Sequence, residues 1–193
     1  FILSLALSFG TSIYIYKTIN AGSTPKFSQT IVIDAGHGAR DAGCNGINTG
    51  VKESDLNLSI SLKLKKYLED FGFNVVLTRE NDSPLYSPNA TNCKREDMEK
   101  REQIINNAKA DLVVSIHMNS FPEPSQKGAQ CFFNPNSEES KKLADAIQGQ
   151  LKKQIDNARN ESHKGDYFIL NLSDTTPISI VECGFLTNPD EEK

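Results

Sequence analysis

The feature that most constrains the fold is a series of short apolar runs that alternate with amphipathic stretches along the chain. Most of these runs are continuously apolar rather than alternately apolar and polar. This pattern is typical of strands that are buried on both faces, as in a parallel sheet. The runs predict strands at Thr30–Asp34, Asn74–Thr78, Leu112–His117, Ala129–Phe133 and Ile178–Glu182.

Three amphipathic helices are expected between these strands. In the first, which ends at Gly72, apolar residues recur at helical spacing, at Leu56, Ile60, Leu64, Tyr67, Leu68 and Phe71. The second covers Arg95–Lys109, and the third begins after Ser137, an N-cap residue followed by two glutamates. Strands that alternate with helices predict an α/β fold, a single domain in which helices flank a mostly parallel central sheet.

The N-terminal end differs from the rest of the chain. Its first sixteen residues, FILSLALSFGTSIYIY, are mostly apolar and are followed by Lys17. We expect residues 1–17 to be a signal peptide or an N-terminal membrane anchor, which would place the folded part outside the cytoplasm. A buried core helix is the alternative. Residues 18–29 include the polar stretch STPKFSQ and are expected to be a linker, so the folded domain should span residues 30–193.

Composition excludes one class of function and leaves one question open. The net charge of -4 argues against a general nucleic-acid binder, which would carry a basic surface. In an exported protein, Cys44, Cys93, Cys131 and Cys183 could form disulfides. Their wide spacing, in a domain large enough to fold without such bonds, is equally consistent with free thiols.

Polar residues stand where the expected strands end. Asp34 ends the first strand and His37 follows it, His117 ends the third, and Glu182 ends the last. In α/β folds the carboxyl ends of parallel strands form the edge where ligands bind. Glu53 lies just ahead of the first helix, in the loop that His37 begins, so it can reach the same edge. We therefore expect these side chains to converge.

Two histidines and a glutamate are a known ligand set of catalytic zinc, and they leave a fourth position to water. Zinc lowers the pKa of such a water to roughly 7 and polarises a carbonyl. A further carboxylate can carry a proton to a leaving nitrogen. The expected convergence of His37, Glu53 and His117, with Glu182 nearby, thus indicates metal-assisted hydrolysis of an amide or a similar bond.

Each of these residues also has a structural interpretation. A single histidine at a strand end is often only hydrogen-bonded, and Glu53 could simply favour the start of a helix. Glu182 is harder to explain in this way, because a carboxylate that ends a buried apolar strand is costly unless it is paired or functional. His163, within the polar stretch NESHKGDY, is expected to be solvated.

Five segments, in order, carry a resemblance to a known family: IVIDAGHGARDAG, KESDLNL, LTREND, REQIINNAKADLVVSIHMNS and VECGFLTNP. From Thr30 to Pro189 the chain resembles the zinc-dependent N-acetylmuramoyl-L-alanine amidases of the amidase-3 type. The resemblance implies one zinc ion and cleavage of the amide between the lactyl group of N-acetylmuramic acid and L-alanine in peptidoglycan. It implies that the zinc ligands are His37, Glu53 and His117 and that the catalytic glutamate is Glu182.

The resemblance extends to two further residues and to a subgroup. Asn119 matches the motif SIHMN and is expected to bind substrate, and Arg79 matches LTR and is expected to brace the sheet edge. The chain is similar to the germination-specific amidases of endospore-formers, which help to make muramic lactam in the spore cortex. The apolar N-terminal segment, the stretch GDYFIL and the absence of wall-binding repeats support this subgroup. A general cell-wall autolysin of the same family is the alternative.

The partners follow from this resemblance. We expect peptidoglycan as substrate, a membrane contact through the N-terminal segment, an activating partner protein and no nucleic acid. Because the family continues beyond the point that corresponds to NPDEEK, we expect the C-terminus to be truncated. Three other readings remain open: a sugar deacetylase or D,D-carboxypeptidase with the same metal ligands, a non-catalytic wall-binding module, and an enzyme that needs a partner to bind zinc.

Overall fold

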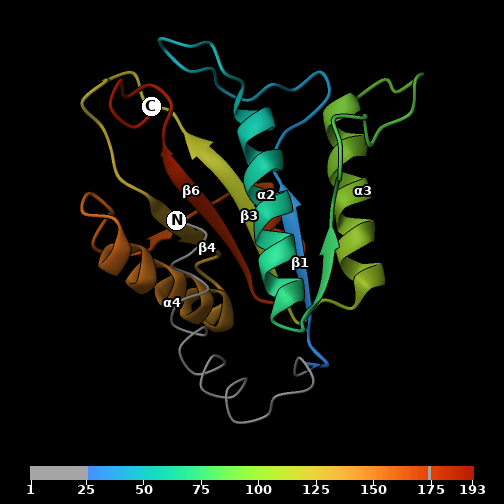
Figure 1. Cartoon of the computed structure of the whole chain (residues 1–193). Helices are drawn as coiled ribbons and strands as arrows, with labels where there is room; N and C mark the ends of the chain where they lie inside the picture. The colour runs from blue at the N-terminus through green and yellow to red at the C-terminus, as the bar shows by residue number, and fades with distance from the viewer. Residues whose placement is uncertain (1–25, 174) are drawn as a thin grey trace.

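In the part of the chain that the structure describes, six strands form one sheet in the order β2-β1-β3-β6-β4-β5 (Figure 1). The structure is a computed structural model that describes residues 26–173 and 175–193. Strand pairs β1–β2, β1–β3 and β3–β6 are parallel, whereas β4 runs antiparallel to β6. The strands are β1 (Thr30–Ala35), β2 (Asn74–Leu77), β3 (Leu112–Asn119), β4 (Gln130–Phe133), β5 (His163–Lys164) and β6 (Ile178–Phe185). The predicted α/β fold with a mostly parallel sheet is confirmed.

Helices cover both faces of this sheet; they are α2 (Glu53–Asp70), α3 (Cys93–Ala108), α4 (Glu138–Gln154) and the 3-10 turn η1 (Phe168–Asn171). Figure 1 shows α2 in front of the sheet, crossing β1 and β3. Leu64 of α2 and Ile147 of α4 belong to the same apolar cluster as Ile33. Ile105 of α3 belongs to a second cluster with Val32. Neighbouring residues of a strand point to opposite faces, so α2 and α4 cover one face and α3 covers the other.

The predicted helix ends agree with the structure where a capping residue is present. The side chain of Ser137 accepts a hydrogen bond from the N–H of Ser140 at 3.2 Å, as an N-cap does. Gly72 follows α2 with a φ of 97°, a conformation that favours glycine. The second helix begins at Cys93, two residues earlier than expected, because Asn92 caps it by accepting from the N–H of Arg95.

Two short elements were not predicted, and three strands continue past their expected ends. The exposed pair that forms β5 is held by pairing with Phe132 and Phe133, and it carries no apolar pattern of its own. His163 lies in β5 and is exposed, as expected. The strand β6 continues through Gly184 to Phe185, and its register with β3 shifts between the His117–Glu182 and Asn119–Phe185 pairs.

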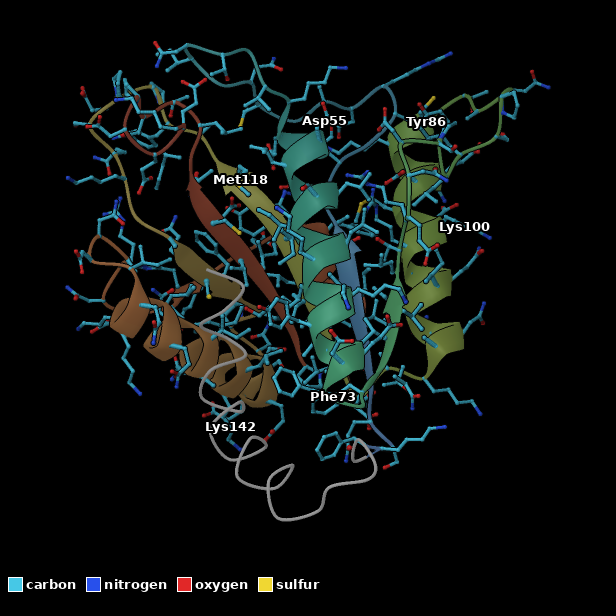
Figure 2. All side chains as sticks on the ribbon, viewed as in Figure 1. Asp55, Phe73, Tyr86, Lys100, Met118 and Lys142 are labelled. Carbon is cyan, nitrogen blue, oxygen red and sulfur yellow. The ribbon has the colours of Figure 1, made fainter. Side chains whose placement is uncertain are left out.

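The N-terminal predictions fall mostly outside the described residues. This applies to the whole of residues 1–17, the expected signal peptide or anchor, and to most of the linker. The described end of the linker is attached to the domain, since the rings of Phe27 and Phe73 stack with centroids 4.5 Å apart (Figure 2 labels Phe73 at the foot of α2). Among residues 26–173 and 175–193, none of the helices has both the length and the apolar character needed to span a bilayer. The four cysteines are free thiols.

Candidate metal centre

Strand register brings the polar strand-end residues together on one face. His117 of β3 lies opposite Glu182 of β6, and Asp34 of β1 lies opposite Ser115 of β3. Ile180, two residues before Glu182, packs in the apolar cluster that contains α3. Residues two apart in a strand share a face, so His117 and Glu182 lie on the α3 side of the sheet. The convergence expected from the strand ends is present.

Glycines allow the chain to approach these side chains closely. Gly36, directly after β1, lies so near the ring of His117 that a Cβ there would overlap it. A Cβ at Gly43 would overlap the carboxylate of Glu53, and Gly43 also has a φ of 68°. His37 itself has a φ of 60°, which is uncommon for a residue with a side chain. The loop between β1 and α2 is therefore shaped around the site.

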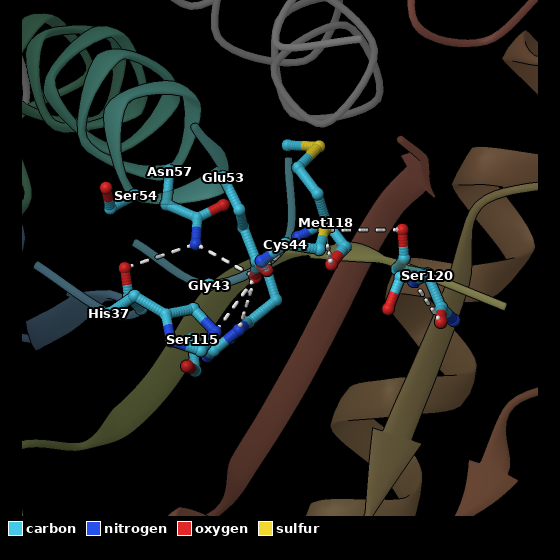
Figure 3. A network of polar contacts seen from close by, with 12 residues as sticks. His37, Gly43, Cys44, Glu53, Ser54, Asn57, Ser115, Met118 and Ser120 are labelled. Carbon is cyan, nitrogen blue, oxygen red and sulfur yellow. Dashed lines mark hydrogen bonds and ion pairs between the residues drawn. The ribbon is translucent and has the colours of Figure 1, made fainter. Parts of the chain in front are cut away.

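Two histidine side chains converge on one carboxylate oxygen of Glu53. Glu53 Oε1 is 3.1 Å from His37 Nε2 and 3.0 Å from His117 Nδ1. The two imidazole rings meet edge to face, with centroids 4.9 Å apart. Figure 3 shows Glu53 extending from α2 toward His37, with dashed contacts at its carboxylate. Within the described part of the chain, these three residues form the one group whose donor atoms all lie within 4.8 Å of one another.

Hydrogen bonds hold Glu53 in its ionised form. Its Oε2 accepts from the N–H of Cys44 at 2.9 Å, and Oε1 accepts from the N–H of Met118 at 3.2 Å. Burial alone would raise the pKa of this carboxyl, but its contacts with the two histidines and with Cys44 lower the pKa well below the usual range. Glu53 is therefore an anionic, buried and oriented oxygen donor.

His37 is surrounded by negative charge. Its Nδ1 lies 2.9 Å from Asp41 Oδ2, while its Nε2 faces Glu53. Burial lowers the pKa of His37, but hydrogen bonds and charge from Glu53 and Asp41 outweigh burial and raise the pKa to about 9. Without a cation in the site, the imidazole is protonated at neutral pH. The site thus attracts positive charge.

Glu182 is a buried carboxyl in the same groove. It is 8% exposed, and its Oε2 has no hydrogen-bond partner among the described residues. Burial raises the pKa of Glu182 to about 7, against the lowering effect of His117 and His37. Buried polar atoms are rarely left without a partner, so this oxygen points to a functional role.

A groove of about 840 Å³ contains these residues. It runs over the α3 side of the sheet, between the N-terminal half of α3 and the segment 167–169. Asn119, the expected substrate-binding residue, also lines it, and its Oδ1 accepts from the N–H of Ser120. His163 is exposed on β5 and is not among the residues that line the groove.

Asp34 serves a structural purpose. Its Oδ1 accepts from Thr78 Oγ1 at 2.7 Å and from Arg101 Nη1 at 2.6 Å, and its Oδ2 accepts from Ser115 Oγ at 2.6 Å. Both carboxylate oxygens are therefore engaged. The strand-end acid nearest to His37 in the sequence thus supports the sheet edge, and it does not belong to the group of three donors.

Arginines hold the loop that carries His37. Arg79, expected to brace the sheet edge, donates to the carbonyls of Ala35, Gly36 and Ser54 at 2.8 to 3.0 Å. Arg101 was not expected to take part, yet its Nη2 donates to the carbonyl of His37 at 2.7 Å. Its position on the inner face of the second helix was the available signal, because a buried arginine needs a partner.

The donor set fits zinc. Zinc in proteins takes imidazole nitrogens and carboxylate oxygens, and catalytic sites use three protein ligands. Here two imidazole nitrogens and one carboxylate oxygen converge, the carboxylate is ionised, and the groove gives access to them. The unpartnered oxygen of Glu182 provides a further polar group in the same groove.

Several known proteins are similar to this chain over most of its length. The family model Amidase_3, described as N-acetylmuramoyl-L-alanine amidase, matches residues 31–193. The germination-specific N-acetylmuramoyl-L-alanine amidase of Bacillus subtilis is 34% identical over 175 residues, which cover 88% of this chain and 72% of that protein. The CwlD amidase from Clostridioides difficile, solved in complex with the GerS lipoprotein, superposes with a TM-score of 0.79 at 38% identity and covers 85% of this chain and 86% of its own. The catalytic domain of the amidase CwlV from Bacillus (Paenibacillus) polymyxa var. colistinus gives a TM-score of 0.73 at 29% identity, over 85% and 84% of the two chains.

Proposed function

Because the chain belongs to the Amidase_3 family of N-acetylmuramoyl-L-alanine amidases, we propose that His37, Glu53 and His117 bind one zinc ion and that Glu182 is the catalytic carboxylate. The protein is a peptidoglycan amidase that hydrolyses the bond between N-acetylmuramic acid and L-alanine. The observation that supports the zinc proposal is the convergence of both histidines on one oxygen of Glu53.

The side chains around the groove account for the proton movements of the reaction. When bound, zinc supplies a Lewis acid that polarises the amide carbonyl and lowers the pKa of water beside it. Glu182, opposite His117, takes a proton from the attacking water and delivers it to the alanine nitrogen as the C–N bond breaks. The products are a lactyl carboxylate and a free alanine amino group. Asn119 is proposed to orient the substrate through its amide nitrogen.

We propose that this amidase acts in the spore cortex, on the strands that become muramic lactam during sporulation. The name of the germination-specific relative supports this role. Residues 30–193 would be the catalytic domain, and residues 1–17 would export it or anchor it to the membrane. The solved complex of CwlD with the GerS lipoprotein supports a protein partner for this chain, and we propose that such a partner activates it.

The first test combines metal content with product identity. Purified wild type, Glu182→Gln and the control Glu161→Gln, an exposed residue of a distant loop, are compared on purified peptidoglycan. We expect one zinc per chain in all three, new L-alanine amino termini from wild type and control, and a loss of about 10²- to 10⁴-fold in Glu182→Gln. Release of acetate or of terminal D-alanine would contradict the amidase. A wild type that remains without zinc and inactive, even with added zinc, would contradict an autonomous zinc site.

The cortex role has its own test. The chain and its Glu182→Gln variant are expressed in Bacillus subtilis that lacks its germination-specific amidase, and the muramic lactam of the spore cortex is measured. Restoration by the wild type alone supports the cortex role. An active enzyme that leaves the cortex without muramic lactam would favour a general autolysin.

A further inference from the structure

The two ring nitrogens of His37 have different partners. Nε2 lies 3.1 Å from Glu53 Oε1, in the group of three donors, whereas Nδ1 lies 2.9 Å from Asp41 Oδ2. A carboxylate can only accept a hydrogen bond, so Nδ1 carries the proton of this contact. Nε2 is therefore the nitrogen of His37 that is available to a cation.

Asp41 is itself held by the turn that contains it. Its N–H donates to the carbonyl of Gly38 at 3.0 Å, and its own carbonyl accepts from the N–H of Gly38 at 2.8 Å. Its Oδ1 accepts from the N–H of Gly43 at 3.1 Å. With one oxygen bound to the backbone, the other is directed at His37. This arrangement exists although the side chain of Asp41 is 58% exposed.

His37 and His117 are held in different ways. Gly36 and Gly38, which have no side chains, flank His37, and its side chain is 25% exposed, against 20% for His117. The ring of His117, in contrast, rests directly on Gly36, so packing fixes its orientation. The backbone of His37 is held through its carbonyl by Arg101, and this contact does not set the rotation of the ring.

We propose that Asp41 is the positioning residue of His37: it accepts the Nδ1 proton and holds the ring so that Nε2 presents its lone pair to the zinc ion. The inference rests on the proposed zinc site. When Nε2 binds a cation it gives up its own proton, while the Nδ1 proton stays in the hydrogen bond to Asp41. Carboxylates that orient a metal-binding histidine in this way typically raise metal affinity about 10- to 100-fold.

Metal affinity and the state of the ring test this proposal without relying on activity. Zn²⁺ alone is titrated against a chromophoric chelator in wild type, Asp41→Asn, Asp41→Ala and Asp55→Asn. Asp55→Asn is the control. It removes the same negative charge near the site, from an exposed residue in the first turn of α2 (Figure 2). We expect Asp41→Ala, which removes the acceptor, to bind Zn²⁺ about 10- to 100-fold more weakly than wild type. Asp41→Asn, whose amide oxygen can still accept from Nδ1, should lose less, and Asp55→Asn should stay within about twofold of wild type.

Long-range ¹H–¹⁵N spectra of the imidazoles supply a second readout. In the zinc-loaded wild type, we expect His37 to show a single tautomer with the proton on Nδ1. In Asp41→Ala we expect this Nδ1–H signal to broaden or to be lost, while the signals of His117 stay unchanged. Because Asp41 is exposed, the melting temperature of the metal-free protein should fall by only a few degrees in either variant.

The outcomes separate this inference from the proposed function. A wild type that binds no Zn²⁺ would overturn an autonomous zinc site and this inference with it. A wild type that binds Zn²⁺ no more tightly than Asp41→Ala does would leave the zinc site standing and overturn the role of Asp41. An equal loss of Zn²⁺ affinity in Asp55→Asn would also overturn the role of Asp41, because the loss would then come from removing a negative charge near the site and not from the hydrogen bond to His37.

Discussion

At the scale of single residues, close contacts with glycine decide where the donor side chains lie. The ring of His117 rests on Gly36, and the carboxylate of Glu53 rests on Gly43, at separations that a Cβ would not allow. Gly36 lies outside the left-handed range of φ, so its role is to leave space for a neighbour. A glycine that allows such an approach is required even where the backbone would accept another residue.

Replacement of Gly36 by alanine should therefore displace His117. We expect weaker Zn²⁺ binding and a fall of about 10²-fold in kcat/KM, because a shift of about 1 Å at a reacting centre has effects of this size. Zinc content and initial rates on peptidoglycan measure both. Gly149→Ala is the control: its Cβ meets nothing within 4 Å, so it should keep full activity. Because Gly149 lies inside α4, this change should stabilise the protein by about 0.5–1 kcal/mol. Full activity in Gly36→Ala would contradict this account.

At the scale of elements, one buried side chain joins α3 to the end of β1. Arg101 is 2% exposed and donates to Asp34 Oδ1, to Asp97 Oδ2 and to the carbonyl of His37. The apolar contacts of Ile105 place the helix on the sheet, and Arg101 then ties it to the loop that supplies His37. Packing of α3 and geometry of the site are thus coupled through this residue.

Removal of this link should be costly. In Arg101→Met, Asp34 stays buried without its positive partner, and we expect the free energy of unfolding to fall by about 3–5 kcal/mol. Urea unfolding measures the change. Arg95→Met is the control on the same helix, because Arg95 pairs with Glu99 at the surface, where solvent screens the pair, and its loss should change the free energy of unfolding little. Equal losses of unfolding free energy in the two variants would show that the buried pair of Arg101 and Asp34 contributes no more to stability than the surface pair does.

At the scale of the whole molecule, the same pair makes stability depend on pH. Burial alone would raise the pKa of Asp34, but the charge of Arg101 and the hydrogen bond from Ser115 bring it to about 2, below the ordinary value of 3.8. The folded state therefore binds this proton less tightly than the unfolded state does. The resulting stabilisation, on the order of 2 kcal/mol, is complete above about pH 4 and is lost as the pH falls through about 2.

Urea unfolding over this pH range tests the effect. The free energy of unfolding of the wild type should fall more steeply with acid than that of Asp34→Asn, which has no proton to gain at this position. Asp166→Asn, which lacks an exposed carboxylate elsewhere, should follow the wild type. Parallel curves for the wild type and Asp34→Asn would contradict the lowered pKa.

Most of the fold could be predicted because its signals are local. Apolar runs and helical periodicity depend on neighbours within a few residues, and the cap at Ser137 depends on the next turn of the chain alone. In contrast, β5 and η1 exist because other segments hold them. The pair that forms β5 is hydrogen-bonded to β4, some thirty residues earlier in the chain. No local pattern of residues predicts such a contact.

The sequence by itself determined the α/β class, the order of the main elements and the placement of His37, Glu53, His117 and Glu182 near one edge, because parallel strands carry their carboxyl ends to the same side. Only the tertiary structure decided which atoms meet there. It selected Nε2 of one histidine and Nδ1 of the other, paired His37 with Asp41, and engaged both oxygens of Asp34 away from the donors. The physical reason is that hydrogen bonds and steric contacts act over a few ångströms. Partners at such distances are set by the packing of distant segments, which a local pattern of residues does not encode.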